Sequence, residues 1–181
     1  MQKEKPVLEL RMGPLHPDED PALGVPAMVY PYSAGIYGGL LGGLAMTPFA
    51  VAYGLLSGSG IWYPVNLIAA TLIRDWQQYT PYQISDFNLA GVLIGLAIHF
   101  AVATGLGLAF VTLLPTLPGS PLFWAFIVGP ILWFGATFGI LPLLNPVMAR
   151  LVDWSSFGLA NITYSLVMGI WVARTPKIKA N

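Results

Sequence analysis

Long apolar runs separated by short polar segments dominate the pattern of this chain. Four such runs, residues 33–57, 87–114, 122–144 and 157–173, contain no Asp, Glu, Lys or Arg. A helix needs roughly 20 apolar residues to cross the hydrocarbon core of a bilayer, which is about 30 Å thick. The first three runs reach this length and the fourth is slightly short. The pattern predicts an all-α polytopic membrane protein with four transmembrane helices.

A fifth apolar stretch, residues 63–76, is too short to cross a membrane and ends in Arg74-Asp75-Trp76. Aromatic residues cluster around it, which is typical of segments at headgroup depth. It predicts a short interfacial or re-entrant helix between the first two spans. Arg150 and Asp153 occupy a similar place in the second half. We expect these interfacial charges, Arg74 with Asp75 and Arg150 with Asp153, to form ion pairs that hold the surface segments.

Small side chains recur at four-residue spacing within the apolar runs, which on a helix forms a ridge against which another helix packs closely. The predicted packing residues are Gly35, Gly39 and Gly43 in the first run, Gly91, Gly95, Ala103 and Gly107 in the second, Gly135 and Gly139 in the third, and Asn161, Ser165 and Gly169 in the fourth. Asn161 is polar at membrane depth and predicts an interhelical hydrogen bond worth roughly 1 kcal/mol.

The two halves of the chain resemble each other. Pro64 and Asp75-Trp76 match Pro142 and Asp153-Trp154, and residues 87–90 match residues 157–160. Continued without gaps, the second match pairs Gly91 with Asn161, Gly95 with Ser165 and His99 with Gly169. It predicts two parallel units, each built of a span, a surface segment and a second span. The alternative is chance similarity between apolar segments of low complexity.

His99 is the only ionisable side chain within the predicted spans. One interpretation is a hydrogen bond to a neighbouring helix or to a partner subunit, and this one is favoured. A second is an axial ligand of haem or chlorophyll, with Gly95 leaving room for the macrocycle and Met46 or Met168 as second ligands by residue type alone. A third, a proton relay, lacks an Asp or Glu at depth. No cofactor is therefore expected, with haem or chlorophyll at His99 as the alternative.

Composition narrows the possible functions. The chain is 56% hydrophobic and 9% charged, with a mean hydropathy of +0.69, whereas charged residues make up about a quarter of an ordinary soluble domain. The net charge is zero and basic residues are scattered, so a nucleic-acid partner is not expected. There is no cysteine, and no sequence motif for nucleotide binding, metal binding or a nucleophilic triad is present. We therefore expect no enzymatic activity of its own.

The chain divides into three parts by pattern. The frequent prolines of residues 1–32 predict an extended arm. This arm is either a disordered tail or a strap across a partner subunit. Residues 33–174 predict the four-helix transmembrane domain, and residues 175–181 a short basic tail. The basic residues near the two ends are Lys3, Lys5, Arg11, Arg174, Lys177 and Lys179. This distribution predicts that both termini are cytoplasmic.

Two stretches carry a family resemblance: the twelve residues from Tyr32, Tyr-Ser-Ala-Gly-Ile-Tyr-Gly-Gly-Leu-Leu-Gly-Gly, and the run Gly-Ile-Trp-Tyr-Pro-Val-Asn-Leu-Ile-Ala-Ala from Gly60. The chain resembles uncharacterised small four-span bacterial inner-membrane proteins, some of which are found beside respiratory oxidase components. The resemblance covers about residues 32–174. It implies a bacterial inner-membrane location and an accessory role in a respiratory electron-transfer complex. It carries over no functional residue.

These observations favour a non-catalytic integral membrane subunit that contacts lipid and other integral membrane subunits within a larger complex. The alternative from a different class is a small homo-oligomeric transporter or channel. A permeation pathway usually shows several polar residues near the midplane, and here only His99, Asn161 and scattered Ser and Thr residues are available. A haem- or chlorophyll-binding subunit, through His99, is the second alternative.

Overall fold

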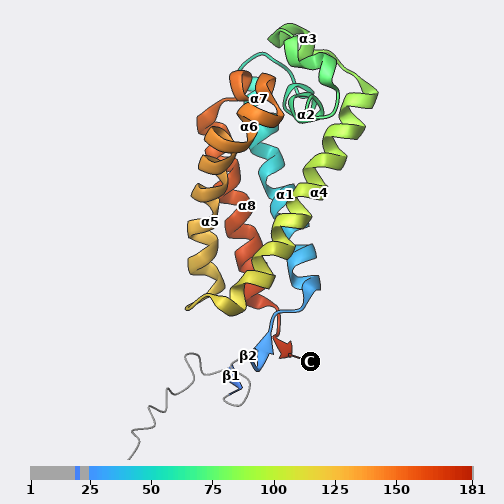
Figure 1. Ribbon diagram of the computed structural model, residues 1–181. Helices are drawn as coiled ribbons and strands as arrows, with labels where there is room; N and C mark the ends of the chain where they lie inside the picture. The colour runs from blue at the N-terminus through green and yellow to red at the C-terminus, as the bar shows by residue number, and fades with distance from the viewer. Residues whose placement is uncertain (1–18, 21–24, 181) are drawn as a thin grey trace, which may run out of the picture.

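The computed structural model describes residues 19–20 and 25–180, which are almost entirely helical in the part carrying the apolar runs (Figure 1). Four helices are long and apolar enough to cross a membrane: Tyr32–Leu56, Leu89–Thr116, Pro121–Leu144 and Trp154–Arg174. The predicted fold class, an all-α protein with four candidate transmembrane helices, is confirmed. The fourth span has 21 residues and is longer than the sequence pattern predicts.

Three of these spans begin at a polar side chain that caps the helix. α4 (Leu89–Leu113) starts after Asn88, α5 (Pro121–Gly135) after Ser120 and α8 (Trp154–Arg174) after Asp153, and each capping side chain accepts a hydrogen bond from a backbone N–H of the first turn. Such a bond satisfies a helix-terminal donor that has no partner within the helix. The first span, α1 (Tyr32–Leu56), begins after Pro31 without a side-chain cap.

The third span is a composite of three helical segments. After α5, the chain forms the π-helical segment η3 (Ala136–Ile140) and then α6 (Leu141–Leu144). The N–H of Leu141 donates to the carbonyl of Ala136, five residues earlier. Pro142 has no N–H with which to continue a regular α-helical ladder, which accounts for the change of winding at this position. The second span likewise ends in a 3-10 turn, η2 (Leu114–Thr116).

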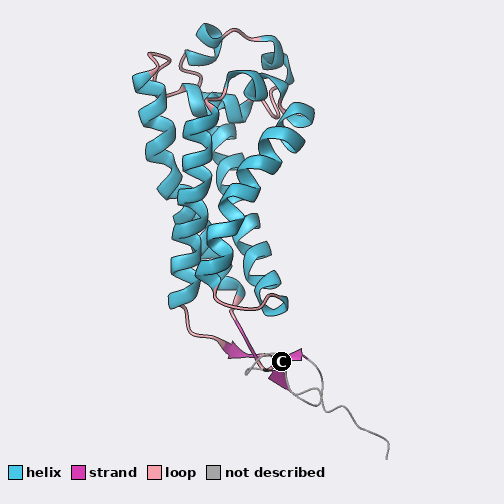
Figure 2. Cartoon of the chain, turned by 90° about the vertical axis from the view of Figure 1, so that its left-hand side faces the viewer, coloured by secondary structure: helices cyan, strands magenta, loops and turns pink. Residues whose placement is uncertain are grey.

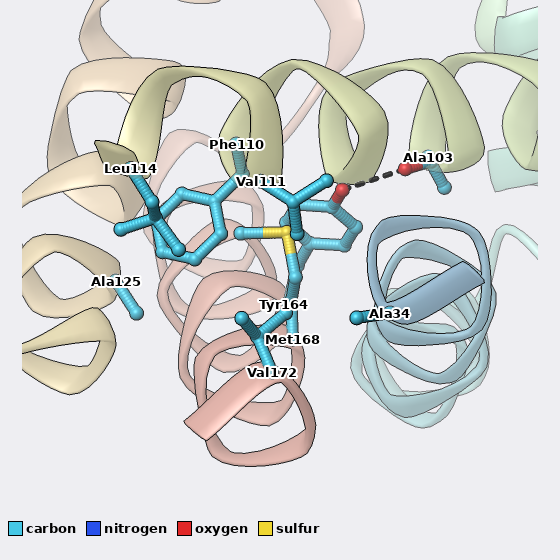
Figure 3. Close-up of a cluster of buried hydrophobic side chains, with 9 residues drawn as sticks. All are labelled: Ala34, Ala103, Phe110, Val111, Leu114, Ala125, Tyr164, Met168 and Val172. Atoms are coloured by element: carbon cyan, nitrogen blue, oxygen red, sulfur yellow. Dashed lines mark hydrogen bonds between the residues drawn. The ribbon is translucent and has the colours of Figure 1, made fainter. Parts of the chain in front are cut away.

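α1 and α8 lie side by side, and the other two spans pack on the outside of this pair. α4 packs on α1, and α5 packs on α8 (Figure 1). Buried residues from all four spans form one hydrophobic cluster, whose members are Ala34, Ala103, Phe110, Val111, Leu114, Ala125, Tyr164, Met168 and Val172 (Figure 3). The Tyr164 hydroxyl donates a hydrogen bond of 2.7 Å to the carbonyl of Ala103, which joins α8 to α4.

Two connecting segments cover the same end of the bundle (Figure 1). The first, residues 57–88, contains α2 (Tyr63–Ala69), the 3-10 helix η1 (Arg74–Gln78) and α3 (Pro81–Ser85). The second, residues 145–153, contains α7 (Pro146–Leu151). The single helix predicted over residues 63–76 is wrong in extent, because α2 ends at Ala69 and the chain turns before η1 begins at Arg74.

At the opposite end, the start of α1 and the end of α8 are joined by short strands (Figure 2). β3 (Met28–Val29) pairs antiparallel with β4 (Ile178–Lys179), and β1 (Glu19–Asp20) pairs with β2 (Val25–Pro26). The last residues of the predicted arm therefore bind the tail of the same chain. Most of the predicted arm, residues 1–18 and 21–24, lies outside the described residues.

Candidate functional site

The glycines of α1 occupy two adjacent rows, and each row faces a different helix. Gly35 and Gly39 meet the backbone of Gly107 and Ala103 on α4, and a Cβ atom on Gly35 would lie 2.6 Å from the carbonyl oxygen of Gly107. Even alanine would therefore force the two helices apart. The structure places Gly35, Gly39, Gly43, Ala103 and Gly107 at the contact of α1 with α4, and Gly43 faces the side chains of Ala103 and His99.

The second row, Gly38 and Gly42, packs against Met168 and Tyr164 of α8. In the sequence these two glycines form a second row at four-residue spacing beside the first, and this spacing also indicates close backbone approach. Together the two rows let α1 approach both α4 and α8 at backbone distance. This explains the central position of α1 in the bundle.

The ridges on the other spans meet partners of three kinds. On α4, Gly91 and Gly95 contact Trp76 and Val65 of the first connecting segment instead of another span. On α8, Ser165 and Gly169 pack against Gly129 and Ala125 of α5. Gly135 and Gly139 were predicted to pack, but a Cβ atom on either would meet no heavy atom within 4 Å among the described residues. The Gly135–Gly139 face of the third span therefore has no partner within the described part of this chain.

Asn161 is buried, but its side chain does not bond to another helix. Its Nδ2 atom donates to the carbonyl of Phe157, one turn earlier in α8, at 2.8 Å. The predicted interhelical hydrogen bond is wrong. The physical reason is that a carbonyl four residues earlier in the same helix is within reach of a short amide side chain.

The two halves share their order of elements, but their contacts define a different register from the sequence match. Gly35 packs on Gly107 and Gly39 on Ala103 in the first half, while Ala125 packs on Gly169 and Gly129 on Ser165 in the second. These contacts make Ala103 equivalent to Ser165 and His99 equivalent to Asn161. The predicted pairing of Gly95 with Ser165 is displaced from this by about two helical turns.

His99 joins α4 to α1. Its Nε2 atom lies 3.0 Å from the carbonyl oxygen of Gly43. A carbonyl only accepts, so Nε2 carries the proton in this hydrogen bond. The hydrogen-bond interpretation of His99 therefore matches the geometry. The space beside Gly95, where the sequence suggested room for a macrocycle, is occupied by Val65.

The interfacial charges do not pair as predicted within the described residues. Nη1 of Arg74 donates to the carbonyl of Leu144 at 2.7 Å, and Nη2 of Arg150 donates to the carbonyl of Gln77 at 3.1 Å. Asp153 caps α8 by accepting from the N–H of Ser156. The prediction of ion pairs is wrong because each guanidinium reaches a backbone carbonyl on the other half of the chain. The two arginines nevertheless join the halves, because Arg74 of the first half bonds the second and Arg150 of the second half bonds the first.

Between these arginines lies a buried polar junction that the sequence analysis missed. Asn145 is fully buried, and its Nδ2 atom donates to the carbonyl of Leu67 at 2.7 Å and to Oγ1 of Thr71 at 2.9 Å. Its Oδ1 atom accepts from the N–H of Met148 and from Nε2 of Gln77. Oε1 of Gln77 in turn accepts from the N–H of Val147. The side chain of Asn145 thus has all of its polar atoms bonded, which positions α7 against α2.

A cavity of about 130 Å³, partly open to the outside, lies below this junction, between α1, α4 and α8 and under α2 and α7. Its walls are mainly apolar, with Met46, Leu96 and Phe157 among them. The polar side chains at its boundary are His99 and Thr47 at the span level and Tyr53, Tyr63, Asp153 and Ser156 near the connecting segments. Burial raises the pKa of Tyr63, with the neighbouring Tyr53 adding to the effect, and its hydroxyl donates to the carbonyl of Leu151. Tyr63 is therefore a neutral donor at the cavity wall.

The cavity and the Gly135–Gly139 face are two separate features that are not explained by the folding of the described chain alone. The cavity offers a mostly apolar chamber with a histidine in its wall and the Asp153 carboxylate at its boundary. The Gly135–Gly139 face offers a shallow, small-residue surface directed away from the bundle. No protein-family model, curated protein or solved structure matches this chain.

Proposed function

We propose that this protein is a non-catalytic integral membrane subunit that packs within a larger complex of the bacterial inner membrane, with both termini in the cytoplasm. The observation that carries the proposal is the Gly135–Gly139 face. Ten of the twelve predicted packing residues lie at helix contacts or in the buried interior of this chain. The other two are Gly135 and Gly139, where an added Cβ atom would meet no heavy atom of the described residues within 4 Å.

Glycine at a lipid-facing position has no local benefit. It offers no side chain to contact lipid, and within a helix it costs about 1 kcal/mol relative to alanine. Glycines four residues apart instead allow another helix to approach at backbone distance, where van der Waals contact drives association in lipid. Phe134 and Phe138 lie beside Gly135 and Gly139, are exposed, and contact each other as tilted rings with centroids 4.6 Å apart. A transmembrane helix of another subunit suits an exposed surface of small residues bordered by aromatic rings.

The nature of the parent complex rests on the resemblance of residues 32–174 to small bacterial membrane proteins found beside respiratory oxidase components. On that basis we propose a respiratory electron-transfer complex. A haem- or chlorophyll-binding role through His99 is an alternative that would use Nδ1 or would require Nε2 to release Gly43. A small homo-oligomeric transporter is the other alternative. Against it, the buried polar side chains of Asn161 and Ser165 both bond within α8 instead of lining an open path.

Blue-native electrophoresis of native membranes, followed by mass spectrometry of the band, tests the proposal. We expect the wild-type chain to migrate with larger integral membrane subunits and Gly139→Leu to be released from them. Ala97→Leu, a substitution of similar size on an exposed part of α4, is the matched control and keeps the high-mass band. If Gly139→Leu leaves the band unchanged, the Gly135–Gly139 face is not the contact. A small homo-oligomer that carries solute flux in liposomes overturns the subunit role.

A further inference from the structure

We propose that the cavity beneath the connecting segments binds one neutral phenolic ring, with the phenol hydroxyl donating a hydrogen bond to Nδ1 of His99. This proposal concerns a ligand site inside the chain. It is independent of the Gly135–Gly139 face and of the identity of the parent complex.

The hydrogen bond of His99 to Gly43 fixes which ring nitrogen can accept from a ligand. Nε2 donates its proton to the carbonyl of Gly43, so in the neutral imidazole Nδ1 carries the lone pair. Nδ1 has no hydrogen-bond partner among the described residues. It is also not one of the fully buried polar atoms that lack a partner, so a ligand can reach it. His99 lines the cavity. An unpaired acceptor in an apolar environment is costly and is relieved by a ligand that donates to it.

The volume of the cavity suits a single aromatic ring. A cavity of about 130 Å³ is close to the engineered apolar cavity of about 150 Å³ that binds benzene. One six-membered ring fits such a volume, and a tetrapyrrole does not. The walls supplied by Met46, Leu96 and Phe157 match the faces of an aromatic ring, and methionine sulfur and aromatic edges make favourable contacts with such rings.

The polar side chains in the rest of the cavity wall favour a neutral ligand that donates a hydrogen bond. Thr47 uses its hydroxyl proton in a bond to the carbonyl of Gly43, so it offers only acceptor capacity to the cavity. At the other end, the carboxylate of Asp153 lies at the boundary and disfavours an anion. A phenolate or a carboxylate is therefore a poor ligand. A neutral ring that donates one hydrogen bond suits both ends of the cavity.

The test uses the full chain in lipid nanodiscs, labelled with nitrogen-15 in the histidine rings. The chain has two histidines, so His16 serves as an internal reference. Titration with p-cresol should shift the Nδ1 resonance of His99 saturably. Toluene fits the same volume but has no hydroxyl, and 4-methylanisole has no hydroxyl proton. We expect both to leave the Nδ1 resonance without the hydrogen-bond shift and to bind roughly five- to tenfold more weakly.

Two variants test the location of the ligand. Ala160 is buried at the cavity wall, and Ala160→Phe should fill the cavity and abolish the p-cresol response. Ala50→Phe does the same from α1, and circular dichroism identifies whichever variant remains folded. Ala97→Phe, on an exposed part of α4, is the control and retains the response. A wild-type His99 resonance that never saturates, or that responds equally to p-cresol and 4-methylanisole, overturns the proposal even if both cavity variants fail to fold.

A second ligand arm distinguishes small phenols from larger membrane-soluble phenolic compounds. If an isoprenoid hydroquinone produces the same Nδ1 shift as p-cresol at lower concentration, the tail contributes contacts beyond the cavity. If only p-cresol produces the shift, the site admits the free ring alone. Either result supports the phenolic site, and a response to neither contradicts it.

Discussion

Nε2 of His99 on α4 lies 3.0 Å from the carbonyl oxygen of Gly43 on α1, and this hydrogen bond crosses the interface about one turn beyond Gly39, where the backbones of the two helices meet. Gly43 lacks a side chain, so the imidazole reaches the backbone of the facing helix. The same carbonyl accepts from Oγ1 of Thr47 at 3.1 Å. One polar contact in an otherwise apolar interface therefore depends on a glycine and a histidine together.

Replacing His99 with phenylalanine keeps a ring of similar size and removes the donor. We expect His99→Phe to lower the free energy of unfolding by about 0.6–1 kcal/mol, the usual value of an interhelical hydrogen bond in a membrane. The loss is modest because Thr47 still bonds the carbonyl. Denaturant titration in mixed micelles measures it. Leu93→Phe, at an exposed position of α4, is the control, and equal stability of both variants would show that the bond contributes nothing.

The same hydrogen bond predicts the spectroscopy of the purified protein. A haem iron bound by Nε2 would have to displace the proton that now bonds Gly43, and one bound by Nδ1 would need more room for its tetrapyrrole than the cavity of about 130 Å³ gives. We therefore expect the isolated chain to show no Soret absorbance. Stoichiometric haem or chlorophyll that disappears in His99→Ala would contradict this expectation and would favour the ligand interpretation of His99.

The contact between α1 and α4 predicts a sharp difference between two glycines. Gly35→Ala places a methyl group 2.6 Å from the carbonyl oxygen of Gly107, so we expect a loss of roughly 1–3 kcal/mol from overpacking. Gly105→Ala on α4 meets no atom within 4 Å among the described residues and should be neutral or slightly stabilising. Unfolding in mixed micelles compares the two. A Gly35→Ala variant as stable as Gly105→Ala would mean that the helices do not approach this closely.

The polar junction predicts that Asn145 matters more than its place in a short segment suggests. Asn145→Leu leaves the carbonyl of Leu67 and the N–H of Met148 without their partner in a buried site. We expect a loss of roughly 1–3 kcal/mol, the usual cost of a buried polar group left unpaired. Asn88→Asp, which keeps the cap of α4, is the control. Proteolysis within residues 57–88 provides a second readout, since a released connecting segment is cleaved faster.

Hydropathy alone was enough to predict the spans, because in lipid each backbone polar group must be satisfied within its own helix. The glycine spacing of α1 also predicted contact faces, since only closely approaching backbones need so many small residues. It did not identify the partner of each face. Gly91 and Gly95 have the same spacing as Ala103 and Gly107, yet they contact a connecting segment instead of a span.

The polar junction could not be predicted from the sequence for a different reason. Asn145 and Gln77 lie far apart in the chain, in segments with no long periodic pattern, and amide side chains are common in exposed loops. The cavity could not be predicted from the sequence either, because its walls come from five helices that are separate in the chain. For the charged residues, sequence proximity favoured a pair of Arg74 with Asp75, whereas folding brings Arg74 to the carbonyl of Leu144.

The central claim is that the Gly135–Gly139 face contacts a helix of another subunit, and site-specific photo-crosslinking in native membranes tests it most directly. Phe138 is exposed beside Gly139 and is replaced by p-benzoylphenylalanine, with Leu93 on the exposed side of α4 as the control position. We expect position 138 to crosslink to one other integral membrane protein and position 93 to crosslink mainly to lipid. Crosslinks from position 138 to lipid alone, or to a second copy of this chain alone, would contradict the account.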